Sequence, residues 1–456
     1  MPTRSESPPG AVPLLGHFPA YASDPLGFVT RVSAEYGGVV PIRFGPFPAL
    51  LLTDATAIDE VLVAKSRDFR KSRAANRVGV VVGEGLLLSE GETWRAHRRT
   101  VQPAFHHDRV RAWAEVMVNE AEAHVSAWDD GEVRDIHREM TDLTLSIVGR
   151  TLLDSRLDER DFEEVRDSVA ILTDHFDSRF NGLAYFIPDR LPTPGNLRMR
   201  RAVRRLDRIV YRLIRTRRAT VSRGGDAISM LLDASAGDAT PPTDREVRDE
   251  VMTLFMAGHE TTAVALTWAI HLLSRSAEAT AALESELADV LGGRLPTVDD
   301  LSRLRYTEAV VLEALRLFPP AYAISREAIR PTTVAGRALP KAGIAFISVW
   351  ATHRRADIFE NPSTFEPERW LEGLTRRLPR GAYLPFAEGP RKCLGASFAM
   401  QEAVLVLATI ARRFSFRPVD SKEVIPRPAV TLRPAEPVKL TVRSRPIDAM
   451  PPNQGA

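Results

Sequence analysis

Cysteine is almost absent from this chain of 456 residues, which contains only Cys393. A single cysteine cannot form an intramolecular disulfide, so the sequence excludes the disulfide-stapled scaffolds of small secreted proteins. Long apolar runs are also missing near the N-terminus, where MPTRSESPPGAVPLLGHF is too interrupted for a signal peptide or a membrane span. We therefore expect a cytoplasmic protein without an integral membrane anchor.

An excess of one charge is lacking as well. The chain has 61 Lys and Arg against 59 Asp and Glu, a net charge of +2, so we expect no nucleic acid partner. Internal repeats and long Gly/Ser linkers are absent, and the hydrophobic content of 44% can fill a large core. We expect a monomer with a single domain over residues 10–445, flanked by disordered segments at 1–9 and 446–456.

Helical periodicity covers most of the chain between about residues 90 and 320. Short β-rich pieces occur at 39–65, 333–349 and 428–443. These patterns predict a mainly α fold with small β-sheets at its margins.

Two helices are important for function. The first is predicted to begin at the capping box Thr243-x-x-Glu246 and to end near Ser274. It is apolar nearly all round, so it should cross the core. The second is predicted to run from about Leu301 to Leu317, where two following prolines stop it.

The only cysteine lies in the segment FAEGPRKCLG, directly before an apolar helical pattern. The free N–H groups and the dipole at a helix start, together with Arg391 and Lys392, favour the thiolate form of Cys393, which is the form that binds metal. Gly389 allows a tight turn and the close approach of a flat cofactor. A buried structural thiol is the alternative interpretation of a lone cysteine.

A polar motif, Ala257-Gly258-His259-Glu260-Thr261, interrupts the long central helix. Glycine inside a helix costs about 1 kcal/mol relative to alanine, so Gly258 requires a reason, such as room for a small bound molecule. Thr261 can donate a hydrogen bond to an upstream carbonyl, and an acid beside an alcohol can relay protons. An ordinary core helix with a polar face is the alternative.

The segment 386–395 resembles the heme-binding signature F-x-x-G-x-R-x-C-x-G of the cytochrome P450 family at every fixed position. Three further family motifs follow the expected order along the chain. Residues 257–262 match A-G-x-[D/E]-T-T, residues 313–316 match E-x-x-R, and residues 367–370 are similar to P-E-R-F with Trp in place of Phe. The resemblance implies the cytochrome P450 fold, a triangular α-helical prism that encloses heme b.

The resemblance also implies a role for each matching residue. Cys393 would be the metal ligand, because a cysteine thiolate binds the iron in this family. The W-x-x-x-R motif at Trp94 and Arg98 would hold a heme propionate, a role for which His97 could compete. The implied roles are cofactor binding for Trp94, Arg98, Arg326, Phe386, Gly389, Arg391, Gly258 and Ala257, catalysis for Glu260 and Thr261, and a buried structural network for Glu313, Arg316 and Arg369.

By analogy with the family, a mainly apolar pocket is expected above the heme. Such a lining indicates a lipophilic small-molecule substrate, for example a terpenoid, a fatty acid or a polyketide. His259 and Tyr322 could supply polar anchors. The expected lining residues are Val82, Leu86, Phe176, Phe180, Phe255, His259, Tyr322, Ile324 and Val430.

The resemblance implies a monooxygenase that hydroxylates or epoxidises its substrate with O2 and two electrons. The chain after Cys393 is too short for a fused reductase, so we expect a separate ferredoxin or flavodoxin with its reductase, supplied by NAD(P)H. Two alternatives are a peroxide-driven heme-thiolate enzyme and a non-catalytic heme-binding sensor or carrier. The pair Glu260-Thr261 argues against both, because peroxide-using relatives typically have Arg-Pro there and mere binding requires no proton relay.

The segment 197–218 carries ten arginines together with an apolar stripe at Val203, Leu206, Val210 and Leu213. This pattern predicts an amphipathic basic helix. Its polar face is either simply solvated or in contact with an anionic membrane or an acidic partner. The resemblance places this helix over the substrate entrance.

Overall fold

Helices form most of the computed structural model, as the sequence predicted. The structure describes residues 7–152, 159–180, 188, 191–219, 227–234 and 242–445, so most of the predicted disordered termini and the side chain of Phe180 lie outside it. The α-helices are α1 (Phe18–Ser23), α2 (Pro25–Tyr36), α3 (Ala55–Asp59), α4 (Gly79–Val82), α5 (Gly91–Val101), α6 (His107–Ala112), α7 (Ala114–Val125), α8 (Ile136–Leu152), α9 (Glu159–Phe180), α10 (Pro194–Ala219), α11 (Ala227–Ala234), α12 (Asp244–Ser274), α13 (Ala277–Leu291), α14 (Arg305–Leu317), α15 (Val349–Thr352), α16 (Leu374–Arg377) and α17 (Ala396–Arg413).

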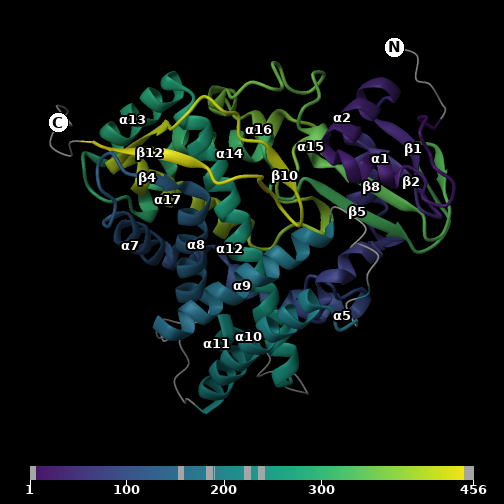
Figure 1. Ribbon diagram of the computed structural model, residues 1–456, viewed down its shortest axis with the longest axis horizontal. Coiled ribbons are helices and arrows are strands. Elements are labelled where there is room, and N and C mark those ends of the chain that lie inside the picture. Colours follow the sequence, from purple (N-terminus) through teal and green to yellow (C-terminus); the bar gives the residue numbers. More distant parts are fainter. Residues whose placement is uncertain are drawn as a thin grey trace.

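The strands form four small sheets, and β1, β2, β8, β11 and β12 lie wholly or mostly in the regions predicted to be β-rich, whereas β3, β4, β5 and β9 lie outside them. The largest has the order β1-β2-β8-β5-β3, in which β2 and β8 run parallel and the other neighbours antiparallel. It lies beside α2 and α15, apart from the long helices (Figure 1). The strands are β1 (Val39–Phe44), β2 (Phe47–Leu52), β3 (Phe69–Lys71), β4 (Val133–Asp135), β5 (Ala323–Ala328), β6 (Thr332–Val334), β7 (Arg337–Leu339), β8 (Ile344–Ser348), β9 (Phe414–Pro418), β10 (Pro426–Pro428), β11 (Leu432–Pro434) and β12 (Lys439–Ser444).

Helix α12 passes through the middle of the molecule (Figure 1). Its predicted capping box is present: Thr243 Oγ1 accepts a hydrogen bond from the Glu246 N–H at 3.2 Å, and the Glu246 carboxylate accepts one from the Thr243 N–H at 2.8 Å. The helix ends at Ser274, as predicted, and most of its residues are buried. Within the described ranges, no helix combines the length and apolarity needed to cross a bilayer.

The predicted start of the second helix at Leu301 was wrong, because α14 begins at Arg305 after a separate 3-10 turn at Val298–Ser302. The Asp300 carboxylate accepts a hydrogen bond from the Thr297 N–H at 2.8 Å and thereby fixes that turn. Glu286 of α13 then accepts the free N–H of Thr307 at 2.8 Å, which caps α14 from outside the helix. A carboxylate from another helix therefore sets the boundary, and no local sequence pattern contains it.

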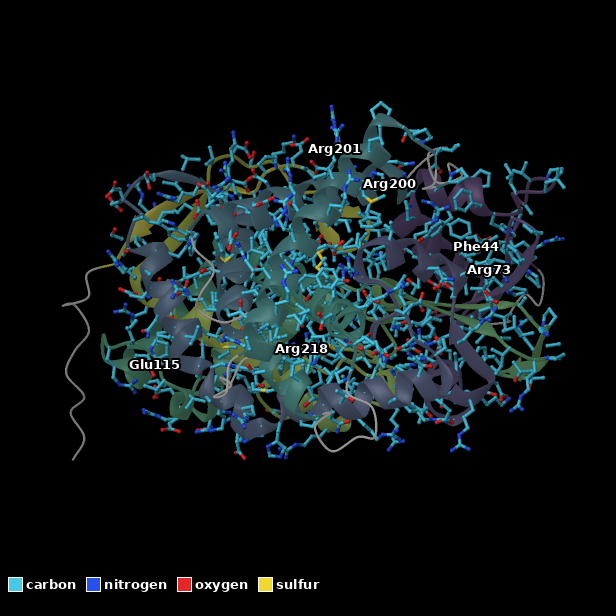
Figure 2. The ribbon with its side chains drawn as sticks, turned by 90° about the horizontal axis from the view of Figure 1, so that it is seen from below. Phe44, Arg73, Glu115, Arg200, Arg201 and Arg218 are labelled. Atoms are coloured by element: carbon cyan, nitrogen blue, oxygen red, sulfur yellow. The ribbon has the colours of Figure 1, made fainter. Side chains whose placement is uncertain are left out.

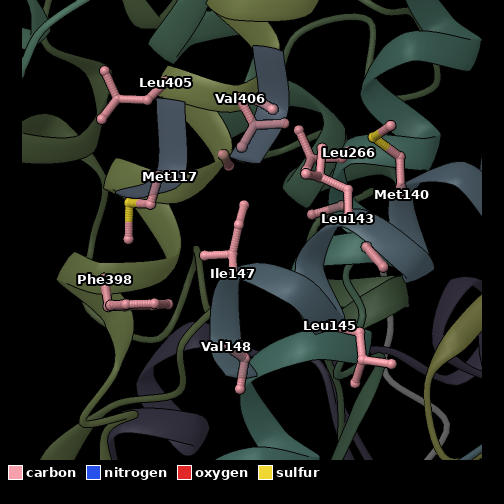
Figure 3. Close-up of a cluster of buried hydrophobic side chains, with 14 of the residues drawn as sticks. Met117, Met140, Leu143, Leu145, Ile147, Val148, Leu266, Phe398, Leu405 and Val406 are labelled. Atoms are coloured by element: carbon pink, nitrogen blue, oxygen red, sulfur yellow. The ribbon is translucent and has the colours of Figure 1, made fainter. Parts of the chain in front are cut away.

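The main hydrophobic core lies where α7, α8, α12 and α17 meet (Figure 3). Leu143 and Ile147 of α8 lie near Leu266 of α12, while Met117 and Val406 come from α7 and α17. All five side chains are fully buried. Each contributes about 1.5–3 kcal/mol of hydrophobic stabilisation, so the contact between α8 and α12 is well fixed.

Candidate active site

The loop that carries the cysteine is tightly folded. The Cys393 N–H donates to the Phe386 carbonyl at 2.9 Å and closes the loop just before α17 begins. Gly389 has φ +73°, and a Cβ there would lie 2.0 Å from the Leu62 carbonyl oxygen. The glycine of the motif is therefore required both by its backbone conformation and by the close approach of Leu62.

The Cys393 side chain is exposed, yet the surrounding protein desolvates the thiol and raises its pKa. The Gly395 N–H, Arg98 and Lys392 act in the opposite direction and lower the pKa. The expected net stabilisation of the thiolate thus needs correction: desolvation outweighs these groups, and Arg98 acts where Arg391 was predicted. A coordinated metal ion deprotonates a thiol outright, so a thiol whose pKa is raised in the metal-free protein can still serve as a metal ligand.

Three cations lie close together beside the cysteine loop. Arg391 donates to the Ser89 carbonyl at 2.9 Å and pairs with Glu90, and its guanidinium lies 4.2 Å from the centre of the Trp94 ring. Arg326 and Lys71 face each other in the β3–β5 ladder. Desolvation and the charge of Arg391 lower the pKa of Arg326 to about 10.

Lys71 was not anticipated from the sequence. Desolvation, followed by the charges of Arg391 and Arg326, lowers the pKa of Lys71 to about 7. Glu90 is the carboxylate that partly compensates these cations. Lys71 and Arg326 meet only through the pairing of two distant strands, so no local motif marked them. Positive charge in excess of its carboxylates fits a ligand that carries carboxylates, such as the propionates of heme.

The substitution Lys71→Met is expected to have opposite effects on stability and on heme binding. Because the folded-state pKa lies below that of the unfolded chain, the charged lysine destabilises the heme-free fold fully below about pH 7, and progressively less up to about pH 10.5. Urea unfolding of the heme-free variant should therefore show equal or greater stability at pH 7. Heme transfer to an acceptor protein should be about 10- to 100-fold more favourable, because a charge-assisted hydrogen bond is lost.

The exposed Lys341 provides the control for this prediction. Lys341→Met should change neither quantity. Heme retention as tight in Lys71→Met as in the wild type would contradict a role for Lys71 in anion binding.

The polar motif of α12 has the geometry predicted for Thr261. The Thr261 hydroxyl donates to the Ala257 carbonyl at 2.7 Å, one helical turn upstream. The Glu260 carboxylate accepts a hydrogen bond of 2.7 Å from Thr431, which lies between β10 and β11. No local motif indicated this partner, because Thr431 lies 171 residues away. Ala257 is exposed, and Glu260 and Thr261 are partly exposed, so this face of α12 is the open one.

Three predictions for α12 need correction. A Cβ on Gly258 would lie 3.2 Å from Val148 of α8, so the glycine allows close helix packing rather than room for a small bound molecule. His259 and Phe255 stack with their ring centres 5.7 Å apart and are buried on the side away from Ala257. Because both residues lie away from Ala257, neither of them lines the open face. Burial lowers the pKa of His259 and keeps its ring neutral.

Tyr322 also differs from its predicted role as a polar anchor. Its hydroxyl donates to the Ala429 carbonyl at 2.9 Å, so this proton is already engaged. The other predicted lining residues remain apolar candidates: Val82 and Phe176 are buried, Leu86 and Ile324 are partly buried, and Val430 is exposed.

Two acidic residues of α12 accept hydrogen bonds from the backbone of the loop before α5. Asp249 accepts a hydrogen bond from the Glu84 N–H at 3.0 Å, and Glu250 accepts one from the Leu86 N–H at 3.1 Å. Glycines at 83 and 85 permit this contact, since a Cβ on either would lie within 2.6 Å of α12 atoms. The loop that carries the predicted pocket residue Leu86 is thereby held against α12.

Glu250, which holds this loop, also contacts His97, which was considered as a propionate ligand. Its Nδ1 lies 2.7 Å from Glu250 Oε1, so the structure directs His97 to Glu250 instead. The carboxylate raises the pKa of His97 above its usual value of 6.5.

This ion pair predicts a pH dependence of stability. Because the folded-state pKa is raised, the contribution is complete below about pH 6.5 and is lost as the pH rises through the folded value. His97→Gln should therefore cost about 1 kcal/mol at pH 6 and less at pH 9, measured by urea unfolding. The exposed pair of His106 with Asp108 is the control, and His106→Gln should cost little at either pH. A cost for His97→Gln that does not change with pH would contradict the pairing.

The predicted network of Glu313, Arg316 and Arg369 is present and buried. Arg316 donates to both carboxylate oxygens of Glu313 at 2.8 Å, and Arg369 donates to Glu313 at 3.0 Å. The Trp370 indole N–H also donates to Glu313 at 2.8 Å, a bond that the usual Phe could not make. Departure from the family pattern thus adds a partner to the buried carboxylate.

His353 connects this network to the chain before the cysteine. Its Nε2 accepts the Leu384 N–H at 2.7 Å, so its Nδ1 carries the proton and donates to the Arg316 carbonyl at 3.1 Å. Burial lowers the pKa of His353 to about 3, which keeps the ring neutral. The network therefore positions the approach to Cys393.

A loop cysteine, excess cations beside it and an acid–alcohol pair on a central helix are the groups expected of a heme-thiolate site. The sequence matches the cytochrome P450 family over residues 7–442, and the chain belongs to that family. It is a cytochrome P450 monooxygenase with the mainly α fold of the family, and the family binds heme through a thiolate.

Its relatives include three bacterial proteins similar along nearly their whole length. Cyclooctatin synthase from Streptomyces melanosporofaciens is 38% identical over 93% of this chain and 92% of the relative. Cyclooctat-9-en-7-ol 5-monooxygenase from the same species is 36% identical over 92% of this chain and 91% of the relative. Pentalenene oxygenase from Streptomyces avermitilis is 34% identical over 96% of this chain and 97% of the relative.

Proposed function

We propose that this monooxygenase hydroxylates or epoxidises a terpenoid. The names of two relatives carry the choice of substrate class, since they give cyclooctat-9-en-7-ol and pentalenene as the molecules oxidised. An apolar substrate also agrees with the side chains proposed for the lining, Leu86, Ile324 and Val430.

The residues present fit heme b. Cys393 would ligate the iron, and the cations Arg98, Arg326, Arg391 and Lys71 would hold the propionates. When bound, heme supplies the redox chemistry that activates O2, and the thiolate increases the electron density on the iron. We propose that residues 10–445 form a single domain, which contains all of these heme-binding residues.

Proton delivery is proposed to use Glu260 and Thr261. The Thr261 hydroxyl donates to Ala257, so its lone pairs remain available to accept a hydrogen bond from a proton donor. Glu260 is held by one hydrogen bond from Thr431 and is partly exposed, which suits a carboxylate that exchanges protons with water.

Electrons are proposed to come from NAD(P)H through a separate reductase and a ferredoxin or flavodoxin, acting on a cytoplasmic monomer. A cavity of about 670 Å³ opens on the cysteine side, between α14, α16 and the cysteine loop. Its wall holds three cations, Lys392, Arg305 and Arg376, and three carboxylates, Glu308, Glu372 and Glu388, so it can pair with charges of both signs on a donor protein.

Comparing oxidant sources tests this function most directly. The holoenzyme should oxidise terpenoids identified by spin-state titration when it receives NAD(P)H, reductase and ferredoxin, and should work poorly with peroxide. Efficient turnover with peroxide alone would favour the peroxide-driven alternative. Heme binding without any substrate-induced spectral change or turnover across the panel would favour a sensor or carrier.

A further inference from the structure

The outward face of α10 carries a continuous row of arginines. The helix has 26 residues, which corresponds to a length of about 39 Å. Successive members of the row are mostly three or four residues apart, so they lie along one face, while residues such as Met199, Leu206 and Val210 are buried on the other. The exposed arginines, here called the arginine stripe, are Arg198, Arg201, Arg204, Arg205, Arg208, Arg212, Arg215 and Arg218.

The protein itself neutralises only part of this charge. Four members have acidic partners. Glu164 of α9 lies 3.1 Å from Arg208 and 4.0 Å from Arg205. Asp161 of α9 pairs with Arg212, and Asp244 of α12 lies 2.7 Å from Arg218. Four other members have no hydrogen bond or ion pair within the described ranges. They are Arg198, Arg201, Arg204 and Arg215. Like charges three or four residues apart destabilise a helix. An external anion that neutralised these four arginines would therefore stabilise α10.

The stripe also has an apolar end. Leu191 is 49% exposed and Leu197 is 39% exposed at the start of α10. The Asn196 side chain donates to the Leu191 carbonyl at 2.7 Å and holds Leu191 beside the first turn. Seen from below, Arg201 in the first half of the helix and Arg218 near its end lie well apart (Figure 2).

We propose that the arginine stripe binds the surface of an anionic lipid bilayer. A bilayer presents phosphates along the whole length of the helix, and the planar guanidinium binds phosphate through two hydrogen bonds. The exposed leucines at one end favour lipid over nucleic acid or an acidic protein, because they can enter the headgroup region. The inference goes beyond the proposed oxidation and holds whatever the substrate is.

Vesicle sedimentation of the holoenzyme tests this proposal. Binding to vesicles of phosphatidylcholine with 30% phosphatidylglycerol should be strong at low salt and should disappear at high salt, and vesicles of pure phosphatidylcholine should not bind. Arg201→Glu with Arg204→Glu should weaken binding at least about 25-fold, since each arginine near an anionic surface strengthens it about fivefold. The milder pair R201Q and R204Q should show the same direction with a smaller effect.

The matched control reverses two exposed arginines elsewhere, Arg109→Glu with Arg417→Glu, and changes the net charge equally. It should bind within about twofold of the wild type. The reduced CO-bound spectrum of every variant confirms folding. Absent binding to anionic vesicles, equal binding to neutral ones, or equal losses in both double variants would overturn the proposal, the first of these being the result expected if the stripe serves an acidic protein.

Discussion

Glu313→Gln is expected to lower the free energy of unfolding by about 3–5 kcal/mol. Glu313 is fully buried and accepts hydrogen bonds from Arg316, Arg369 and Trp370. Removing its charge leaves two guanidinium groups desolvated without a counter-charge, and this cost far exceeds that of a lost surface pair. Urea unfolding of the heme-free protein measures the change directly.

The exposed Glu372, which is close in sequence to Arg369 and Trp370, provides the control. Glu372 lies 3.9 Å from Arg377 with its side chain 85% exposed, so Glu372→Gln should cost less than about 0.5 kcal/mol. A small effect for both substitutions would show that the network does not stabilise the approach to the cysteine.

Thr261→Ala is expected to lower substrate oxidation by at least about 10²-fold, the lower range for a lost proton-transfer group. Electrons should still be consumed, but oxygen should leave as hydrogen peroxide instead of entering the product. The measurement is the ratio of product and peroxide to the NAD(P)H consumed. This readout separates a proton-transfer role from a structural one, because a merely destabilised enzyme loses total turnover without changing that ratio.

Thr267 serves as the matched control on the same helix. Its hydroxyl makes the same bond one turn back, to the Ala263 carbonyl at 2.6 Å, but its side chain is buried away from the open face. Thr267→Ala should therefore leave the product-to-peroxide ratio unchanged. A Thr261→Ala enzyme that oxidises substrate as efficiently as the wild type would contradict the proposed relay.

Features that depend only on residues close together in the sequence could be predicted well. The capping box at Thr243, the hydrogen bond of Thr261 to the preceding turn and the salt bridge of Glu313 with Arg316 each depend on residues three or four positions apart. Such geometry is fixed by the helix itself. The family signature added Arg369, whose contact with Glu313 spans 56 residues.

Features that depend on packing between distant segments could not be predicted. Lys71 and Arg326 meet through strand pairing, and Glu260 meets Thr431 through a hairpin. Gly258 was misinterpreted for the same reason, since its neighbour Val148 belongs to another helix. Sequence periodicity places a residue on a face of a helix but does not say which segment covers that face.

The absorption spectrum of the reduced, CO-bound holoenzyme tests most directly whether Cys393 ligates the heme iron as a thiolate. The wild type should show the strongly red-shifted Soret band of thiolate ligation, and Cys393→Ser, reconstituted with heme, should lose that band. A wild-type band at the position typical of histidine-ligated heme, or a band unchanged by Cys393→Ser, would contradict ligation of the iron by Cys393.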